Sequence, residues 1–163
     1  MKTNACRVLD QLGIAYRTQE YAVDPNDLAA TTVAAKIGMP VEQVYKTLLC
    51  HMASGEYVFA VIAGDAELDL KKLAAAAGEK KAELAPLKQL EPLTGYIRGG
   101  CTALAAKREF PVYADELMEL HEVISVSAGV RGMQMLLAPA DYLRATHATV
   151  ADLTKATLGS AAA

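Results

Sequence analysis

The chain has 163 residues, of which 53% are hydrophobic and 21% charged, and its formal net charge is −3. This composition is typical of a globular protein with one sizeable core. A net negative charge argues against a protein that coats nucleic acid by neutralising many phosphates, but it still allows a local basic cleft that binds one RNA end. No apolar run approaches the roughly 20 residues of a membrane-spanning helix, so we expect no membrane partner.

The number and spacing of the cysteines indicate the cellular compartment in which we expect the protein. Cys6, Cys50 and Cys101 are odd in number and widely spaced, and the sequence contains no CxxC pair. The first residues also lack the hydrophobic region of a secretory signal. Both features favour reduced thiols in a cytoplasmic protein, and they argue against a disulfide framework or structural zinc.

The chain opens with a readable helix, because apolar residues fall at helical spacing until Gly13 ends the pattern. A loosely alternating strand is predicted over residues 14–21. The turn cluster at residues 24–27 also suits the start of a second helix, which ends at Gly38. Pro40 suits the first turn of a short helix that follows.

Buried strands begin in the middle of the chain, over residues 44–50 and 57–63, with a tight turn between them. A helix that Asp69 caps follows and stops at Gly78, and residues 86–90 predict another short helix. Later elements are expected as strands at 110–113, 123–127 and 133–137 and helices at 114–120 and 139–145.

This order of elements predicts an α/β fold of the α+β type. Strands and helices alternate irregularly and short turns join several strand pairs, so a mixed, mainly antiparallel sheet with flanking helices is favoured over a doubly wound parallel one. We see no internal repeat or linker. The sequence therefore predicts a single domain over residues 1–158 and a frayed tail over residues 159–163.

Common catalytic motifs are missing. The sequence has no P-loop, no GxGxxG after a strand, no HExxH and no GxSxG. Its three histidines suit ordinary surface or core positions. We accordingly expect neither a cofactor nor a bound metal.

Lys46 stands out within the first buried strand, because period-two geometry places it on one face with Val44, Leu48 and Cys50. A lysine in apolar company must reach out to solvent, pair with a carboxylate, or point into a cleft that holds an anion. The first two roles are structural, whereas the third would make it a ligand for a phosphate or a developing oxyanion. The residues alone leave these alternatives open.

Two glycine-rich segments follow, at residues 98–102 and 127–132. Glycine lets main-chain N–H groups approach a ligand closely, although either segment could equally be a plain turn between strands.

Three motifs together resemble the YbaK family, free-standing relatives of the editing domain of bacterial prolyl-tRNA synthetase. They are Lys46-Thr47-Leu48-Leu49, then Thr94-Gly95-Tyr96 with Gly99-Gly100, then residues 127–132 before Ala138-Pro139. The resemblance implies a compact fold around a barrel-like sheet, with a cleft for the aminoacylated 3′ end of tRNA. It also implies an enzyme that removes mischarged cysteine from tRNA(Pro), with prolyl-tRNA synthetase as a transient partner and no DNA partner.

The expected chemistry is attack by the substrate's own thiol on its ester, which would explain why no protein nucleophile stands out. By position, the resemblance assigns the catalytic roles to Lys46, Gly99 and Gly100. The substrate-binding positions that it implies are Tyr21, Thr47, Cys101, Ser127, Gly129, Arg131, Gly132 and Gln134.

Two alternatives stay open. The protein could remove alanine or another small residue from tRNA(Pro) by activating water, or it could be a non-catalytic module that binds an RNA end or a protein. Thr102-Ala103 replaces the Ser-Pro of the family, and Gln134 stands where some members place an aspartate. Cys101 is either a small packing residue or a redox-sensitive thiol of the cleft.

Overall fold

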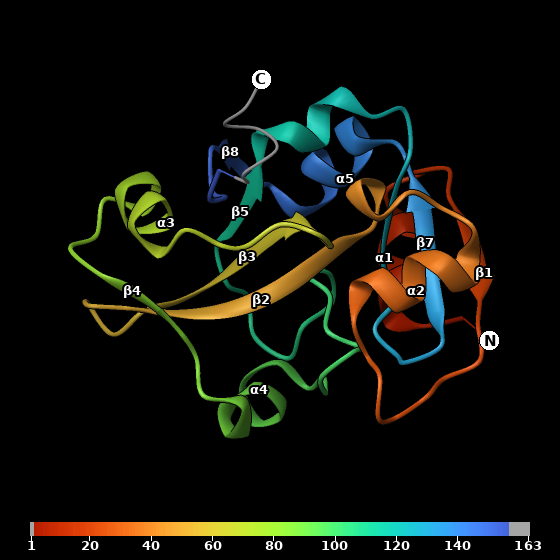
Figure 1. Ribbon diagram of the computed structural model, residues 1–163, viewed down its shortest axis with the longest axis horizontal. Helices are drawn as coiled ribbons and strands as arrows, with labels where there is room; N and C mark the ends of the chain where they lie inside the picture. Colours follow the sequence, from red (N-terminus) through yellow and green to blue (C-terminus); the bar gives the residue numbers. More distant parts are fainter. Residues whose placement is uncertain (1, 157–163) are drawn as a thin grey trace.

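The computed structural model describes residues 2–156, and over this range the chain forms two β-sheets with helices around them (Figure 1). The smaller sheet is antiparallel, in the order β1-β7-β6, and the larger is mixed, in the order β4-β2-β3-β5-β8. The strands are β1 Arg17–Glu20, β2 Tyr45–Met52, β3 Tyr57–Ala63, β4 Ala82–Leu84, β5 Val112–Asp115, β6 Ile124–Ser127, β7 Met133–Leu137 and β8 Thr149–Ala151.

Short helices connect and cover these strands. The α-helices are α1 Asn4–Gln11, α2 Ala30–Ile37, α3 Leu70–Ala77, α4 Leu87–Thr94 and α5 Pro139–Thr146, and the 3-10 helices are η1 Val41–Gln43 and η2 Glu116–Leu120. A parallel bridge between Val44 and Ser125 joins the two sheets. The α+β class predicted from the sequence is confirmed, with the sheet divided into two parts that meet at this bridge.

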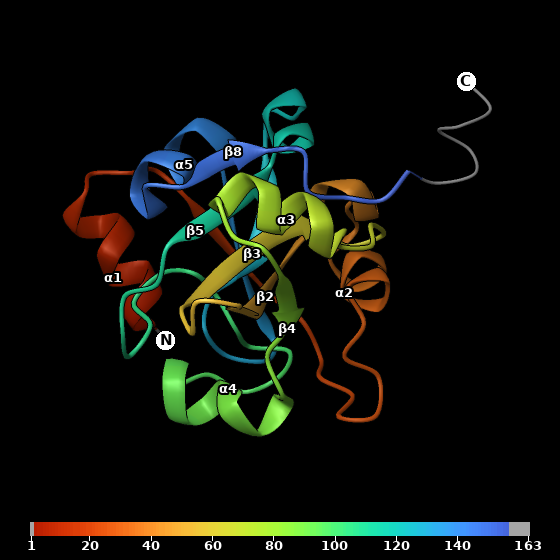
Figure 2. The ribbon, with the colours of Figure 1, turned by 90° about the vertical axis from the view of Figure 1, so that its left-hand side faces the viewer.

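The β2–β3 hairpin separates two regions of the core, because its side chains alternate between its faces. Leu49 and Phe59 belong to one buried cluster, whereas Cys50 and Val58 belong to the other. Figure 2 shows α3 and α4 on opposite sides of this hairpin. Leu73 of α3 is buried in the second of these clusters, and α4 packs against the first.

The second helix begins later than the turn cluster at residues 24–27 suggests. Asp24 accepts a hydrogen bond from Asn26 N (3.0 Å), and Asp27 accepts from Ala29 N (3.3 Å). These local bonds hold the segment in turns, so helical geometry starts only at Ala30. The late start places the first turn of α2 beside a cleft along β2.

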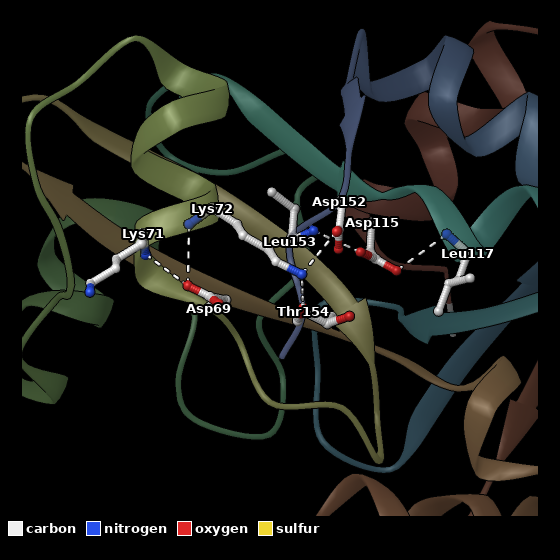
Figure 3. Close-up of polar contacts among 8 residues, drawn as sticks. All are labelled: Asp69, Lys71, Lys72, Asp115, Leu117, Asp152, Leu153 and Thr154. Atoms are coloured by element: carbon white, nitrogen blue, oxygen red, sulfur yellow. Dashed lines mark hydrogen bonds and ion pairs between the residues drawn. The ribbon is translucent and has the colours of Figure 1, made fainter. Parts of the chain in front are cut away.

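Buried Asp115 anchors the last described segment (Figure 3). Its carboxylate accepts hydrogen bonds from Leu117 N (3.2 Å) and Leu153 N (2.9 Å). Lys72 of α3 reaches the same segment, where its Nζ contacts Asp152 Oδ2 (2.8 Å) and Thr154 O (2.7 Å). These contacts tie the chain after β8 to α3. The tail expected from residue 159 lies outside the described residues.

No helix within residues 2–156 is both long enough and apolar enough to cross a membrane.

Candidate active site

A cleft of about 570 Å³ opens beside the first half of β2. Strand β4 pairs with β2 from Cys50 to Met52, and Ala85 N donates to Leu49 O (2.9 Å), so the edge of β2 that faces away from β3 is uncovered over residues 46–48. The start of α2, the segment from β4 into α4, and the turn before Cys101 complete the walls. The lining residues are Leu28, Ala29, Ala30, Thr31, Val33, Val44, Tyr45, Lys46, Thr47, Leu48, Leu49, Gly64, Leu84, Ala85, Pro86, Leu87, Leu90, Arg98, Gly99, Cys101, Ser127 and Gln134.

Main-chain groups of β2 face this cleft. At one end of the β2–β3 ladder Gly64 N donates to Val44 O (2.7 Å), and at the other Met52 N donates to Glu56 O (2.8 Å). The even-numbered residues of β2 therefore bond to β3, so the N–H and C=O of Thr47 point towards the uncovered edge. The Thr47 hydroxyl is buried near the hydroxyl of the core residue Tyr142. A ligand that satisfied the main-chain groups of Thr47 would recover the energy of their desolvation.

Lys46 is half-buried in the cleft wall, and its Nζ donates to Gly64 O across 3.2 Å. Burial lowers the pKa of the ammonium group, although the nearby carboxylates of Asp65 and Glu67 oppose the shift. Neither carboxylate forms an ion pair with Lys46 within the 4 Å that defines one. Of the three roles open to this lysine, pairing with a carboxylate is the one that the described contacts do not show.

The cleft is electropositive although the chain as a whole is acidic. Its charged lining residues are Lys46 and Arg98, and no aspartate or glutamate within residues 2–156 contributes to the lining. The first turn of α2 adds little to this potential, because the Asp27 carboxylate lies at its N-terminus, where it accepts hydrogen bonds from Ala29 N (3.3 Å) and Thr32 Oγ1 (2.7 Å). The arrangement suits a negatively charged ligand.

The glycine pair forms a tight turn in the cleft wall. Gly100 N donates to Ile97 O (2.9 Å), and Gly99 adopts a left-handed φ of 87°. A Cβ on Gly100 would lie 3.1 Å from Arg131 N and from the carbonyl carbon of Val130, both of them backbone atoms. The turn therefore packs directly on the second glycine-rich loop, which explains why two glycines are needed here.

That second loop supports the cleft more than it lines it. Ser127 lines the cleft, and its Oγ accepts a hydrogen bond from Gly129 N (3.1 Å). The Nε of Arg131 donates to Arg98 O (2.7 Å), so this side chain braces the first turn. Gly132 lies against Tyr21, whose N–H donates to the Gly132 carbonyl (2.9 Å).

The structure thus brings six of the expected site residues into the cleft lining and leaves five behind it. The lining members are Lys46, Thr47, Gly99, Cys101, Ser127 and Gln134, whereas the supporting members are Tyr21, Gly100, Gly129, Arg131 and Gly132.

Gln134 and Cys101 line the cleft in contrasting ways. The Gln134 amide oxygen accepts a hydrogen bond from the buried hydroxyl of Ser125 (2.8 Å). Its amide NH₂ group is therefore the end left for a ligand. Burial raises the pKa of the Cys101 thiol to about 12, so this thiol is protonated near neutral pH. A neutral, buried thiol favours the packing role over the redox role for Cys101.

Several lining residues were not predicted from the sequence. Leu28 and Ala30 reach the cleft because α2 starts late, and Leu84 and Leu87 reach it from the β4–α4 connection. Among these residues, only Gly64 could have been recognised in the sequence, because a glycine directly after an apolar strand indicates a close approach of another segment. A Cβ there would lie 2.7 Å from Ala30 Cβ and 2.9 Å from Val44 O, so only glycine lets α2 approach β2 this closely.

Comparison with known proteins defines the class. The model of the aminoacyl-tRNA editing domain matches residues 24–145, which is most of the chain. The chain therefore belongs to the aminoacyl-tRNA editing domain family, as its motifs suggested. This membership confirms the expected class of enzyme, an aminoacyl-tRNA deacylase.

Three similar proteins indicate the kinds of substrate that members of this family act on. The chain is 44% identical over 153 residues to EbsC of Enterococcus faecalis, a proposed Cys-tRNA(Pro)/Cys-tRNA(Cys) deacylase, covering 94% of this chain and 93% of EbsC. It is 31% identical over 111 residues to ProXp-y of Escherichia coli K12, a multifunctional Ser/Thr-tRNA deacylase, covering 66% of each. The crystal structure of a proposed trans-editing enzyme for prolyl-tRNA synthetase has the same fold, with a TM-score of 0.81, 24% identity and coverage of 96% and 99%.

Proposed function

We propose that this protein is a cytoplasmic trans-editing deacylase that removes mischarged cysteine from tRNA(Pro), and that residues 1–158 form its single editing domain. The observation that carries the proposal is the electropositive cleft around Lys46, which combines a cation with main-chain donors and whose lining thiol, Cys101, is kept protonated by a pKa that burial raises to about 12. The likeness to EbsC over nearly the whole chain supports the choice of cysteine.

Lys46 holds the phosphate or ribose end of the terminal adenosine in this proposal. Its Nζ has one weak main-chain acceptor, the Gly64 carbonyl at 3.2 Å, so an anionic ligand can recruit the remaining ammonium protons. The partial burial that lowers its pKa also strengthens its attraction to a phosphate, because less water screens the pair.

The turn at Gly99 and Gly100 positions the ester beside β2. The chemistry then comes from the substrate: its thiol sulfur attacks the ester carbonyl carbon, and a C–S bond forms as the C–O bond to the ribose breaks. The thiol proton ends on the ribose oxygen, and the products are free tRNA and a cyclic thiolactone. The protein contributes positioning and hydrogen-bond donors for the developing oxyanion.

Editing of this kind is needed because a synthetase pocket cannot fully exclude amino acids of similar size. Cysteine and proline are similar in size, and a pocket separates similar apolar groups only weakly, so a second hydrolytic check is useful. The chain carries little surface for reading a whole tRNA, and we therefore propose prolyl-tRNA synthetase as a transient partner.

A second candidate is removal of serine or another small polar residue. Two observations favour this activity. The chain is similar to a Ser/Thr-tRNA deacylase, and the polar residues Thr47, Ser127 and Gln134 line the cleft. Such a substrate has a far weaker nucleophile than a thiol, so the protein would have to position a water molecule. No histidine lines the cleft within residues 2–156, which makes this mechanism less well supported.

The test compares deacylation of Cys-tRNA(Pro) and Ala-tRNA(Pro) by the wild-type protein and by Lys46→Ala. We expect rapid clearance of the cysteine ester, little clearance of the alanine ester, and a loss of activity of at least about a hundredfold in the variant. Lys36→Ala is the matched control, because Lys36 is an exposed lysine bound to the Ala22 carbonyl outside the cleft. Equal clearance of both esters would contradict the thiol mechanism, and clearance of neither would favour a binding module.

A further inference from the structure

Arg98 is the second cation of the cleft, and its side chain is exposed and unpartnered. It forms no hydrogen bond, ion pair or cation–π contact with any residue in the range 2–156. Some other cations of the chain are engaged, since Lys72 and Lys155 contact Asp152 and Glu67, and those left free, such as Arg17, do not line the cleft. A free guanidinium in the lining of the cleft is available to a ligand.

The backbone that carries Arg98 is fixed in advance. Arg98 occupies the second position of the turn that the bond from Gly100 N to Ile97 O closes. Arg131 Nε holds the Arg98 carbonyl at 2.7 Å. A Cβ on Gly99 would lie 3.2 Å from Leu28 Cδ2 and 3.5 Å from Arg131 Cγ, so the turn packs against the loop before α2 as well as against Arg131. Because these contacts hold its backbone, Arg98 can be aimed without ordering a flexible loop on binding.

The two cations differ in depth. Lys46 is half-buried within the wall and is bonded to Gly64, whereas Arg98 is exposed. No carboxylate lines the cleft in the described range, although Asp65 and Glu67 lie near Lys46 without forming an ion pair with it. Two cations at different depths fit a chain-like anion that enters end first, with one charge inside and another at the mouth.

We propose that Arg98 binds a backbone phosphate of the single-stranded 3′ end of the aminoacyl-tRNA, whereas Arg131 acts as a positioning residue that braces the turn. The inference rests on the proposed function, because that function supplies the polyanionic substrate. It reverses the expectation from the sequence, in which Arg131 was the substrate-binding arginine. A guanidinium suits this role, since its fork of donors matches two phosphate oxygens.

The experiment uses three cysteine esters: cysteinyl-adenosine without phosphate, the cysteinyl trinucleotide CpCpA with two phosphodiesters, and Cys-tRNA(Pro). For Arg98→Gln we expect KM to rise about tenfold on the two phosphate-bearing substrates, with kcat unchanged and cysteinyl-adenosine unaffected. The slope of log KM against log salt should fall by roughly 0.7 to 1, as expected when one phosphate contact is lost. Arg17→Gln, an exposed arginine on β1, is the control and should behave as wild type.

Arg131→Met separates positioning from contact. It removes the brace at the Arg98 carbonyl, so activity should fall on all three substrates, cysteinyl-adenosine included. The proposal is overturned if Arg98→Gln loses activity equally on all three substrates, or if it keeps wild-type KM on Cys-tRNA(Pro).

A binding measurement keeps this proposal distinct from the proposed function. Fluorescence anisotropy with a labelled CpCpA oligonucleotide requires no turnover. If the wild type clears no cysteine but binds the oligonucleotide, and Arg98→Gln weakens that binding about tenfold, the proposed activity fails and the phosphate contact stands. If both proteins bind equally, or neither binds, the contact is refuted.

Discussion

The amide oxygen of Gln134 accepts a hydrogen bond from the hydroxyl of Ser125, with 2.8 Å between the two atoms. Both residues are buried, and Gln134 also lines the cleft. The amide therefore presents its NH₂ group to a ligand. A donor there suits the developing oxyanion of an ester and does not suit the substrate's ammonium group, which is the partner that an aspartate would favour.

Gln134→Leu should consequently lower kcat about ten- to a hundredfold on Cys-tRNA(Pro), because it removes this donor while keeping a similar volume. Ser125→Ala should lower kcat less, since it only frees the amide to rotate. The two residues act as one unit, so the double variant should be no worse than Gln134→Leu. Single-turnover rates measure these effects, and additive losses would contradict the coupling.

A side chain at Gly100 should distort the cleft. Its Cβ would meet the backbone of Val130 and Arg131 at about 3.1 Å, and backbone atoms cannot move aside as a flexible side chain can. We expect Gly100→Ala to lower kcat/KM at least about thirtyfold by displacing the turn.

Gly13→Ala is the matched control, because it follows α1, has a φ of 69°, and has no atom within 4 Å of its added Cβ. It should cost roughly 1 kcal/mol of stability through backbone strain and leave the rate unchanged. Thermal melting together with deacylation rates distinguishes the two variants. Wild-type activity in Gly100→Ala would show that the turn does not position the substrate.

The Cys101 thiol should react slowly with alkylating reagents. Burial raises its pKa to about 12, so the reactive thiolate is scarce at every pH below that value and grows only as the pH rises towards 12. At pH 8 we expect iodoacetamide to label Cys101 at least tenfold more slowly than it labels glutathione. Mass spectrometry of the labelled peptide, with Cys101→Ala as the blank, measures the rate. Rapid labelling that a substrate analogue blocks would instead support the redox-sensitive role.

The hydrogen bonds of buried Asp115 should contribute far more to the free energy of unfolding than the ion pair between Lys72 and Asp152. Asp115→Ala would leave the N–H groups of Leu117 and Leu153 without their acceptor, at a cost of roughly 2 to 3 kcal/mol. Asp152→Ala removes a partly exposed ion pair with Lys72 and should cost about 1 kcal/mol or less. Urea denaturation of both variants tests the comparison, and equal losses would contradict it.

Periodicity and turn residues were enough to predict most of the fold. The strand at residues 57–63 and the helix between Asp69 and Gly78 agree with the structure, because alternation and capping are local signals. Strands β4 and β8 were missed, since each has only three residues, which is too short for an alternating apolar pattern to be recognised. Only pairing with β2 and with β5 makes them strands.

The site was less predictable than the fold. Lys46 could be singled out because a charge on an apolar strand face demands an explanation. Leu28 and Arg98 could not, because their place in the cleft depends on where α2 starts and on the brace from Arg131. The location of such residues depends on packing between segments that are distant in the sequence, and a single sequence does not show which segments pack together.

The central claim is that the substrate's own thiol drives the reaction, and an isosteric comparison tests it most directly. The same tRNA(Pro) is charged with cysteine or with serine, and the enzyme-dependent deacylation rates of the two are measured under identical conditions. Serine differs from cysteine by one atom and has a far weaker nucleophile. The account predicts that the cysteine ester is cleared at least about a hundredfold faster; equal rates would contradict it and would require a water molecule that the protein activates.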